Sequence, residues 1–208
     1  MGKLVASIFV SLDNIMVSDN EDMSWVLENF DPEMGSDMGA EVMNSMQAIF
    51  IGRKTHEGMI QVWPNVTEDQ SPGADAMNHT PKFVFSRTLD NASWGRYDNA
   101  TVVKEIDPAR IQRMKQESPE RIVIFGSASI VQQMTDLGLI DEYLLWVHPV
   151  ILGSGKPLFK NNKRTDLKLV RSKAYGSGVT ALTLQPKTEA GSKSRDYAFQ
   201  EAESASKN

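Results

Sequence analysis

The chain has 208 residues with 40% hydrophobic and 24% charged side chains, which is typical of a soluble globular domain with a real core. It has no cysteine, three scattered histidines and a net charge of -5, which argue against disulfides, a metal site and a broad nucleic-acid surface. No apolar run reaches the eighteen residues of a membrane helix, and the N-terminal run is too short for a signal peptide. We therefore expect a cytoplasmic, metal-free protein that binds neither nucleic acid nor membrane.

The first two-thirds of the chain alternates between strand-like and helix-like segments. A nearly continuous apolar run at residues 4–12 predicts a central strand, and apolar residues at helical spacing predict a helix over 36–47. Asp107 and Pro108 are typical of a helix start and predict a helix to residue 117. A further helix is predicted over 127–137, closed by Gly138. The other predicted strands in this part are residues 48–51, 82–85, 100–103 and 121–125.

The last third of the chain has a different pattern. Residues 141–152 predict a long strand with two different faces, and residues 167–174 and 178–184 predict a hairpin around a glycine-containing turn. The fold class expected from this order is α/β, with a mostly parallel sheet, an antiparallel edge and helices on both faces. Residues 1–186 form the predicted domain, whereas the polar segment 187–208 has too little apolar surface to fold and is interpreted as a tail.

Three predicted strands end in residues that suit phosphate groups. Because ligands of open α/β sheets lie beyond the carboxyl ends of the strands, these segments are candidates for one shared site. Each has an ordinary alternative, namely a turn glycine, a helix cap or a solvated charge. Together they predict a ligand with several phosphates, such as a dinucleotide with an additional 2′-phosphate. The segments are Gly52-Arg53-Lys54-Thr55, Ser86-Arg87 and Gly126-Ser127-Ala128.

Several motifs follow one another in a distinctive order. They are VSLDNIMV (10–17), IFIGRKTHEGM (49–59), KFVFSRTL (82–89), RIVIFGSASIVQQM (121–134), LIDEYLLWVHPVILGSGKPLF (139–159) and GSGVTALTL (176–184). In these motifs the chain resembles the dihydrofolate reductase superfamily, in the branch of the C-terminal reductase domain of the bifunctional riboflavin-biosynthesis deaminase/reductase. The resemblance implies a dihydrofolate-reductase-like three-layer αβα fold, with a mostly parallel mixed sheet and an antiparallel C-terminal hairpin.

The resemblance also implies an enzyme, an NADPH-dependent oxidoreductase. Its substrate would be a small pterin, aminopyrimidine or related molecule, with hydride transfer to a C=N or C=O carbon. By this analogy residues 52–55 hold cofactor phosphates, Ser86 and Arg87 the 2′-phosphate, and residues 126–128 the pyrophosphate, while the loop containing Ile15 faces the nicotinamide. Relatives often pair, so a homodimer is implied. The family commonly has Gly-Gly, with a cis bond in the folate enzymes, where this chain has Gly126-Ser127.

The substrate side offers weaker signals, each with an alternative. Trp25 and Asp31 have the spacing of a loop tryptophan and a pterin-binding carboxylate, but Pro32 favours Asp31 as a helix N-cap. Asp13 is the candidate catalytic group, as a proton donor or substrate contact, and its alternative is a turn residue. Gly153 lies at the rim of the nicotinamide pocket by resemblance, and otherwise in a flexible hairpin connection.

Other interpretations remain open at this point. Met34, Met38, Met43 and Met46 either line a deformable pocket or fill the core. The protein is a reductase, or it is a catalytically degenerate NADPH- or nucleotide-binding protein of the same fold. A nucleotide-binding transferase would need a metal-binding acidic pair beside the phosphate loops, which the sequence does not contain.

Overall fold

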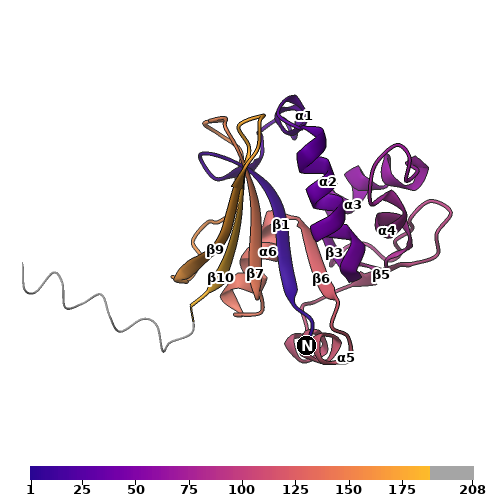
Figure 1. Cartoon of the computed structure of the whole chain (residues 1–208). Helices are drawn as coiled ribbons and strands as arrows, with labels where there is room; N and C mark the ends of the chain where they lie inside the picture. Colours follow the sequence, from indigo (N-terminus) through magenta and orange to yellow (C-terminus); the bar gives the residue numbers. More distant parts are fainter. Residues whose placement is uncertain (188–208) are drawn as a thin grey trace, which may run out of the picture.

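The computed structural model describes residues 1–187. The fold is built around a central eight-stranded sheet (Figure 1). Its strand order is β5-β4-β3-β6-β1-β7-β10-β9, and a second, two-stranded ribbon pairs β2 with β8. The strands are β1 (Leu4–Ser11), β2 (Ile15–Val17), β3 (Met46–Gly52), β4 (Lys82–Phe85), β5 (Ala100–Val103), β6 (Arg121–Gly126), β7 (Glu142–His148), β8 (Lys156–Pro157), β9 (Leu167–Ala174) and β10 (Thr180–Pro186). The helices are α1 (Ser24–Glu28), α2 (Pro32–Glu41), α3 (Arg53–Met59), α4 (Ala74–His79), α5 (Pro108–Glu117) and α6 (Ala128–Asp136), with 3₁₀ turns η1 (Met43–Ser45) and η2 (Trp63–Asn65).

Strand β1 lies in the middle of the sheet, as its apolar sequence predicts. It pairs in parallel with β6 on one side and with β7 on the other. Both faces of a central strand are covered by helices, so both sets of alternating side chains must be apolar. The strands β3 to β7 are parallel to β1, whereas β10 and β9 add antiparallel pairings at the edge. The mixed sheet with an antiparallel C-terminal hairpin is confirmed.

Two hydrophobic clusters fill the space on the two faces of the sheet. On one face, Ile8 of β1 belongs to the cluster that includes Ile111 of α5 and Val131 of α6. On the other face, Val5 of β1 belongs to the cluster that includes Met34 of α2 and Met77 of α4. Because neighbouring residues of a strand point to opposite faces, one strand serves both cores. The three-layer αβα architecture is therefore confirmed.

Two predicted elements have boundaries that are wrong by more than two residues. The helix predicted over residues 36–47 is α2, which begins earlier and ends at Glu41, before β3 starts at Met46. Its start follows from Asp31, whose carboxylate accepts the Met34 N–H at 2.8 Å, and from Pro32 in the first turn. The long strand predicted over residues 141–152 ends at His148, because the next residue, Pro149, has no N–H for a strand ladder.

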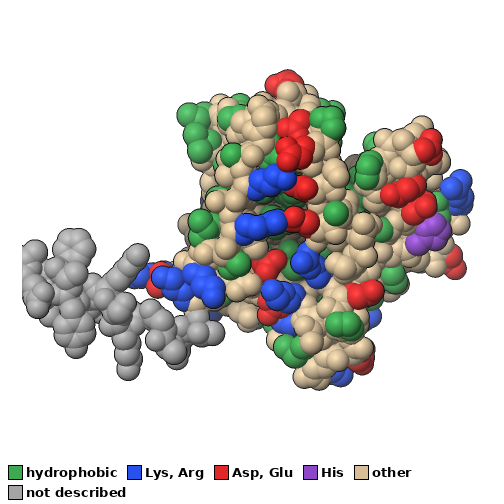
Figure 2. Space-filling model, in the orientation of Figure 1, with side chains coloured by type: hydrophobic (Ala, Val, Ile, Leu, Met, Phe, Trp, Pro, Cys, Tyr) green, Lys and Arg blue, Asp and Glu red, His purple; other side chains and the backbone are tan. Residues whose placement is uncertain are grey.

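The C-terminal hairpin is tied to α2 by charged side chains. Figure 2 shows acidic and basic side chains mixed in a band over this side of the molecule. Arg171 of β9 pairs with Glu41, and Lys173 pairs with Glu33 at 2.8 Å and with Asp37. These ion pairs neutralise Arg171 and Lys173 locally. Within residues 1–187 no helix combines the length and apolar character of a membrane span. The predicted tail at 187–208 lies outside the described residues apart from Lys187.

Candidate functional site

Parallel strand register brings the three phosphate-compatible segments together. Phe85 at the end of β4 pairs with Gly52 of β3, and Ile51 pairs with Gly126 of β6. Three neighbouring parallel strands thus end at one level, so the residues that follow them share one edge of the sheet. They line a single cavity of about 1280 Å³. Its lining includes the predicted cofactor-binding residues Gly52, Arg53, Lys54, Thr55, Ser86, Arg87, Ser127 and Ala128.

Two glycines let the backbone segments at this edge approach one another. A Cβ atom on Gly52 would lie 2.5 Å from the Ser127 Oγ and 3.2 Å from its Cβ. Gly126 is not itself a lining residue, has a φ of 129°, and a Cβ there would lie 2.7 Å from the Met16 Cε. The peptide bond between Gly126 and Ser127 is cis. The ends of β3 and β6 form one continuous surface.

The first turn of α6 contributes backbone donors to the cavity. Ser127, Ala128 and Ser129 all line it, and the Ser127 hydroxyl bonds the Ser129 hydroxyl at 2.9 Å and does not cap the helix. By contrast, Asp31 and Asp107 cap α2 and α5 away from the cavity. A nine-residue helix without a side-chain cap presents unbonded N–H groups and the positive end of its dipole, which suit an anion.

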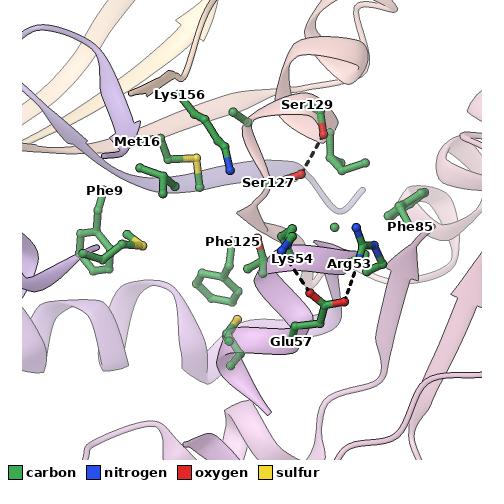
Figure 3. Close-up of a pocket in the computed structure, with 18 of the residues that line it drawn as sticks. Phe9, Met16, Arg53, Lys54, Glu57, Phe85, Phe125, Ser127, Ser129 and Lys156 are labelled. Carbon is green, nitrogen blue, oxygen red and sulfur yellow. Dashed lines mark hydrogen bonds and ion pairs between the residues drawn. The ribbon is translucent and has the colours of Figure 1, made fainter. Parts of the chain in front are cut away.

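Basic and acidic side chains are interleaved around the mouth of the cavity (Figure 3). The Arg53 guanidinium lies 2.7 Å from Glu57, and Lys54 lies 3.7 Å from Glu21. Glu21 also accepts a hydrogen bond from Lys156 at 2.8 Å, which is the main reason that its pKa lies below its usual range. Because these ion pairs are all partly exposed, each contributes little free energy. A bound phosphate can therefore replace Glu57 or Glu21 as the partner of the basic side chains at a modest cost in free energy.

Arg87 differs from Arg53, Lys54 and Lys156, which form ion pairs. It is exposed, and within residues 1–187 it forms no ion pair. The neighbouring Ser86 hydroxyl accepts the backbone N–H groups of Thr88 and Leu89, at 3.2 and 3.0 Å. That turn holds Arg87 at the cavity edge, where its planar guanidinium is suited to a phosphate monoester.

The other half of the cavity is apolar. It lies on the face of the sheet covered by α2 and α4, because alternate residues of β1, β6 and β7 point that way. We call this region the apolar compartment and define it by Phe9, Met38, Met43, Met59, Phe125 and Trp146. Met38 and Met43 thus line a pocket, as one interpretation predicts, whereas Met34 and Met46 are buried in the core outside the lining.

Asp13 does not line the cavity. Its carboxylate accepts the Ser11 hydroxyl at 2.6 Å and the backbone N–H groups of Leu152 and Gly153 at 3.2 and 2.8 Å. The Ser11 hydrogen bond is the largest influence that holds the pKa of Asp13 below its usual range. The residue is ionised at neutral pH and anchors a turn, which is the alternative that its position after a strand favours.

The predicted substrate-side residues Trp25, Asp31 and Gly153 also lie outside the cavity lining, as does the predicted cofactor residue Ile15. Trp25 is buried in α1 with its ring 5.0 Å from that of His148, edge to face. Asp31 is the N-cap of α2, and that bond to Met34 lowers its pKa. Ile15 is buried beside the lining residue Met16, and Gly153 is exposed near the lining residue Gly155. The structure brings the other cofactor candidates together at the cavity but does not place these four in its lining.

Four residues of the apolar compartment escaped sequence reasoning, namely Phe9, Met59, Phe125 and Trp146. Phe9 and Trp146 lie in strands that are apolar on both faces, so no periodic signal separates a cavity-facing side chain from a core one. Ser7 was the available signal, since it is a polar residue within an apolar strand and it lines the cavity. Glu21 and Lys156 are far apart in the chain, and only the fold pairs them. Within residues 1–187, no group of three or more His, Asp or Glu side chains is arranged to hold a metal.

The fold and the cavity define a protein of the dihydrofolate-reductase-like class. The model of the RibD C-terminal domain family matches residues 2–181, so the chain belongs to that family. Two uncharacterized proteins of Bacillus subtilis (strain 168) are similar to it. YyaP is 32% identical over 186 residues, which covers 86% of this chain and 93% of YyaP. YwjB is 30% identical over 178 residues, which covers 85% of this chain and 94% of YwjB. The family supports, at the level of class, a reductase of the riboflavin pathway type.

Solved structures share the fold at lower sequence identity. A Shewanella sp. PV-4 protein, whose name assigns it to riboflavin biosynthesis, superposes with a TM-score of 0.73 at 21% identity, covering 89% of this chain and 99% of its own. A pyrimidine reductase-like protein of Corynebacterium diphtheriae gives 0.61 at 16% identity, with 90% and 93% covered. The Thermotoga maritima diaminohydroxyphosphoribosylaminopyrimidine deaminase/5-amino-6-(5-phosphoribosylamino)uracil reductase gives 0.64 at 13%, with 89% and 57% covered. At these identities the likeness establishes the fold.

Proposed function

We propose that this protein is an NADPH-dependent reductase that acts on a C=N or C=O carbon of a small pterin, aminopyrimidine or related heterocycle. The observation that carries the proposal is the convergence of three strand ends on one cavity, with donors and cations at one end and an apolar compartment at the other. The family supports the reductase class, and the residues at the cavity edge support the choice of a dinucleotide as cofactor.

The residues at that edge fit a phosphorylated dinucleotide. Arg53, Lys54 and Thr55 would hold cofactor phosphates, the first turn of α6 would face the pyrophosphate, and Arg87 with Ser86 would hold the 2′-phosphate. A Cβ atom on Gly52 would fill part of the space between β3 and β6, so glycine keeps the cradle open. When bound, NADPH supplies a hydride, which reduces the acceptor carbon while the acceptor nitrogen or oxygen takes a proton from water.

The protein contributes alignment and exclusion of water. In this proposal the walls of the apolar compartment hold a flat acceptor in place. Alignment of two reactants alone can supply a large part of the reduction in the activation barrier. Asp13 is engaged with backbone donors and is ionised, so water is the proton source in this proposal. Residues of the compartment therefore position the acceptor and do not take part in proton transfer.

Arg87 provides the test of the cofactor assignment. Replacement Arg87→Gln removes a charged partner of the 2′-phosphate, so the Kd for NADPH should rise about ten- to a hundredfold while that for NADH stays within about twofold. Arg113→Gln is the matched control, because Arg113 is exposed on α5 and does not line the cavity. Fluorescence titration or calorimetry measures both constants. Equal affinity of the unaltered protein for NADPH and NADH would contradict the role of Arg87.

A second candidate is a protein that binds NADPH without catalysis. It is favoured by the placement of Asp13 and Asp31, since neither carboxylate lines the cavity. NADPH binding together with no oxidation of NADPH by any pterin, aminopyrimidine or carbonyl compound would support this candidate over the enzyme.

A further inference from the structure

The Glu21 carboxylate connects two elements at the mouth of the cavity. Glu21 lies in the loop that follows β2, and its carboxylate contacts Lys156 of β8 at 2.8 Å and Lys54 of α3 at 3.7 Å. All three residues line the cavity. Figure 3 shows Lys156 and Lys54 reaching the cavity from different elements. Glu21 therefore occupies a position where two amino groups converge, as they would around a bound anion.

Glu57, which also lines the cavity, has a different role. It contacts Arg53 at 2.7 Å and Lys54 at 3.9 Å, and all three residues belong to α3. Pairs at this spacing form within a single helix and do not connect that helix to another element. The Glu21 carboxylate instead comes from a distant part of the chain, so only the fold can place it between the two lysines.

The loop that carries Glu21 is held in an uncommon conformation. Glu21 has a φ of 59°, which few residues with a side chain adopt. Its backbone N–H donates to the Ser18 carbonyl at 3.0 Å, and a Cβ atom at Gly155 would clash with the Val17 carbonyl oxygen. The start of the loop thus packs closely against the segment that carries Lys156. A strained residue that its surroundings hold in place is a common feature of functional sites.

The bridge is weak enough for a ligand to open it. The side chains of Glu21, Lys54 and Lys156 are 53%, 57% and 57% exposed. Because exposed ion pairs contribute little free energy, a phosphate group that enters the cavity can take the place of the carboxylate. Both lysines then keep an anionic partner.

We propose that Glu21 is an internal competitor for a phosphate group and thereby sets the affinity of the cavity for phosphate-bearing ligands. Its carboxylate occupies an anion position between Lys54 and Lys156 in the free protein, and a ligand phosphate takes that position on binding. The inference rests on the proposed function where the phosphate belongs to NADPH. Free pyrophosphate has the same chemistry and would compete in the same way. Glu21 therefore opposes phosphate binding and takes no part in hydride transfer.

Neutralising Glu21 tests the competition. In Glu21→Gln the two lysines lose their carboxylate partner, so at low ionic strength the Kd for NADPH and that for inorganic pyrophosphate should each fall about three- to tenfold. Added salt screens exposed charges, so the gain should shrink below about twofold at about 0.5 M salt. Fluorescence titration measures the NADPH constant and calorimetry measures the pyrophosphate constant, both on the full chain.

Two further variants separate this effect from a change in net charge. Asp19→Asn removes the same charge from an exposed residue of the same loop that does not line the cavity, so both Kd values should stay within about twofold. In a Lys156→Gln background the gain from Glu21→Gln should be smaller, because one of the two cations that Glu21 occupies is absent.

The outcomes separate this inference from the proposed function. Unchanged or weaker binding of both anions by Glu21→Gln would overturn the inference, as would an equal gain in Asp19→Asn. Tighter pyrophosphate binding by Glu21→Gln, with no binding of NADPH to either protein, would refute the proposed function and leave the competition intact. NADPH binding that Glu21→Gln does not strengthen would refute the inference and leave the proposed function standing. Failure of both anions to bind either protein would refute both.

Discussion

Replacement of Gly52 by alanine probes whether the ends of β3 and β6 form one surface. Its φ of -78° is compatible with alanine, so any effect comes from contacts and not from the backbone conformation. The added Cβ would lie 2.5 Å from the Ser127 Oγ, 3.2 Å from its Cβ and 3.3 Å from its backbone nitrogen. Relief to an ordinary 3.4 Å contact needs a movement of about 0.9 Å by the Ser127 hydroxyl oxygen, about 0.2 Å by its Cβ and about 0.1 Å by its backbone nitrogen.

The expected cost is about 1–3 kcal/mol in the free energy of unfolding, as for other insertions into packed sites. The movement also breaks the hydrogen bond between Ser127 and Ser129, which disturbs the first turn of α6. We therefore expect weaker NADPH binding as well as lower stability. Urea denaturation at constant pH measures the free energy, and fluorescence titration measures the Kd.

A double-mutant cycle with Ser127→Gly isolates the contact. Removing the Ser127 side chain takes away the two closest side-chain atoms, so Gly52→Ala should cost at least about 1 kcal/mol less in that background. Gly58→Ala is the control, because a Cβ at this position of α3 meets no atom within 4 Å and should stabilise the helix by about 0.5–1 kcal/mol. Full additivity of the Gly52 and Ser127 changes would refute the contact and the shared surface.

Two further predictions concern groups outside the cavity lining. Burial lowers the pKa of His148 to about 4 from 6.5, so the unfolded chain binds the proton first and stability is lost as pH falls from 6.5 toward 4. His148→Phe should remove about 3 kcal/mol of that acid-dependent loss, measured by denaturation at pH 7 and pH 4; an unchanged pH profile would count against it. Asp31→Ala should cost about 1 kcal/mol in the free energy of unfolding through loss of the α2 N-cap, with NADPH-linked turnover unaffected, and Asp107→Ala should cost a similar amount through loss of the α5 N-cap. A large loss of turnover in Asp31→Ala alone would restore the pterin-binding alternative.

The elements that the sequence predicts correctly are those with local causes. The helix at Pro108–Glu117 follows from Asp107 as N-cap and from proline in the first turn, and both act within a few residues. The same signature at Asp31 and Pro32 marks the true start of α2, whereas the methionine spacing farther along the chain misplaces the helix. Caps are the better guide here because they fix the backbone directly.

The phosphate-compatible segments are predictable for a related reason. A parallel sheet requires each strand to end near its neighbour, so Gly52, Ser86 and Ser127 meet once the strands pair in register. Sequence patterning predicts the strands, and the geometry of the sheet then brings together the segments that follow them. Nothing beyond strand order and register is needed for that result.

The apolar compartment depends on the tertiary structure alone. Ile8 and Phe9 are neighbours in an apolar strand, and only the placement of α2 and α4 decides that Phe9 faces the cavity while Ile8 faces the α5 and α6 core. Likewise, the ion pair between Glu21 and Lys156 forms only because the fold brings the loop that contains Glu21 beside β8. The sequence by itself determined the strands, caps and phosphate-compatible ends, because those follow from short-range preferences. Which apolar side chains enclose a ligand follows from long-range packing, which no local pattern encodes.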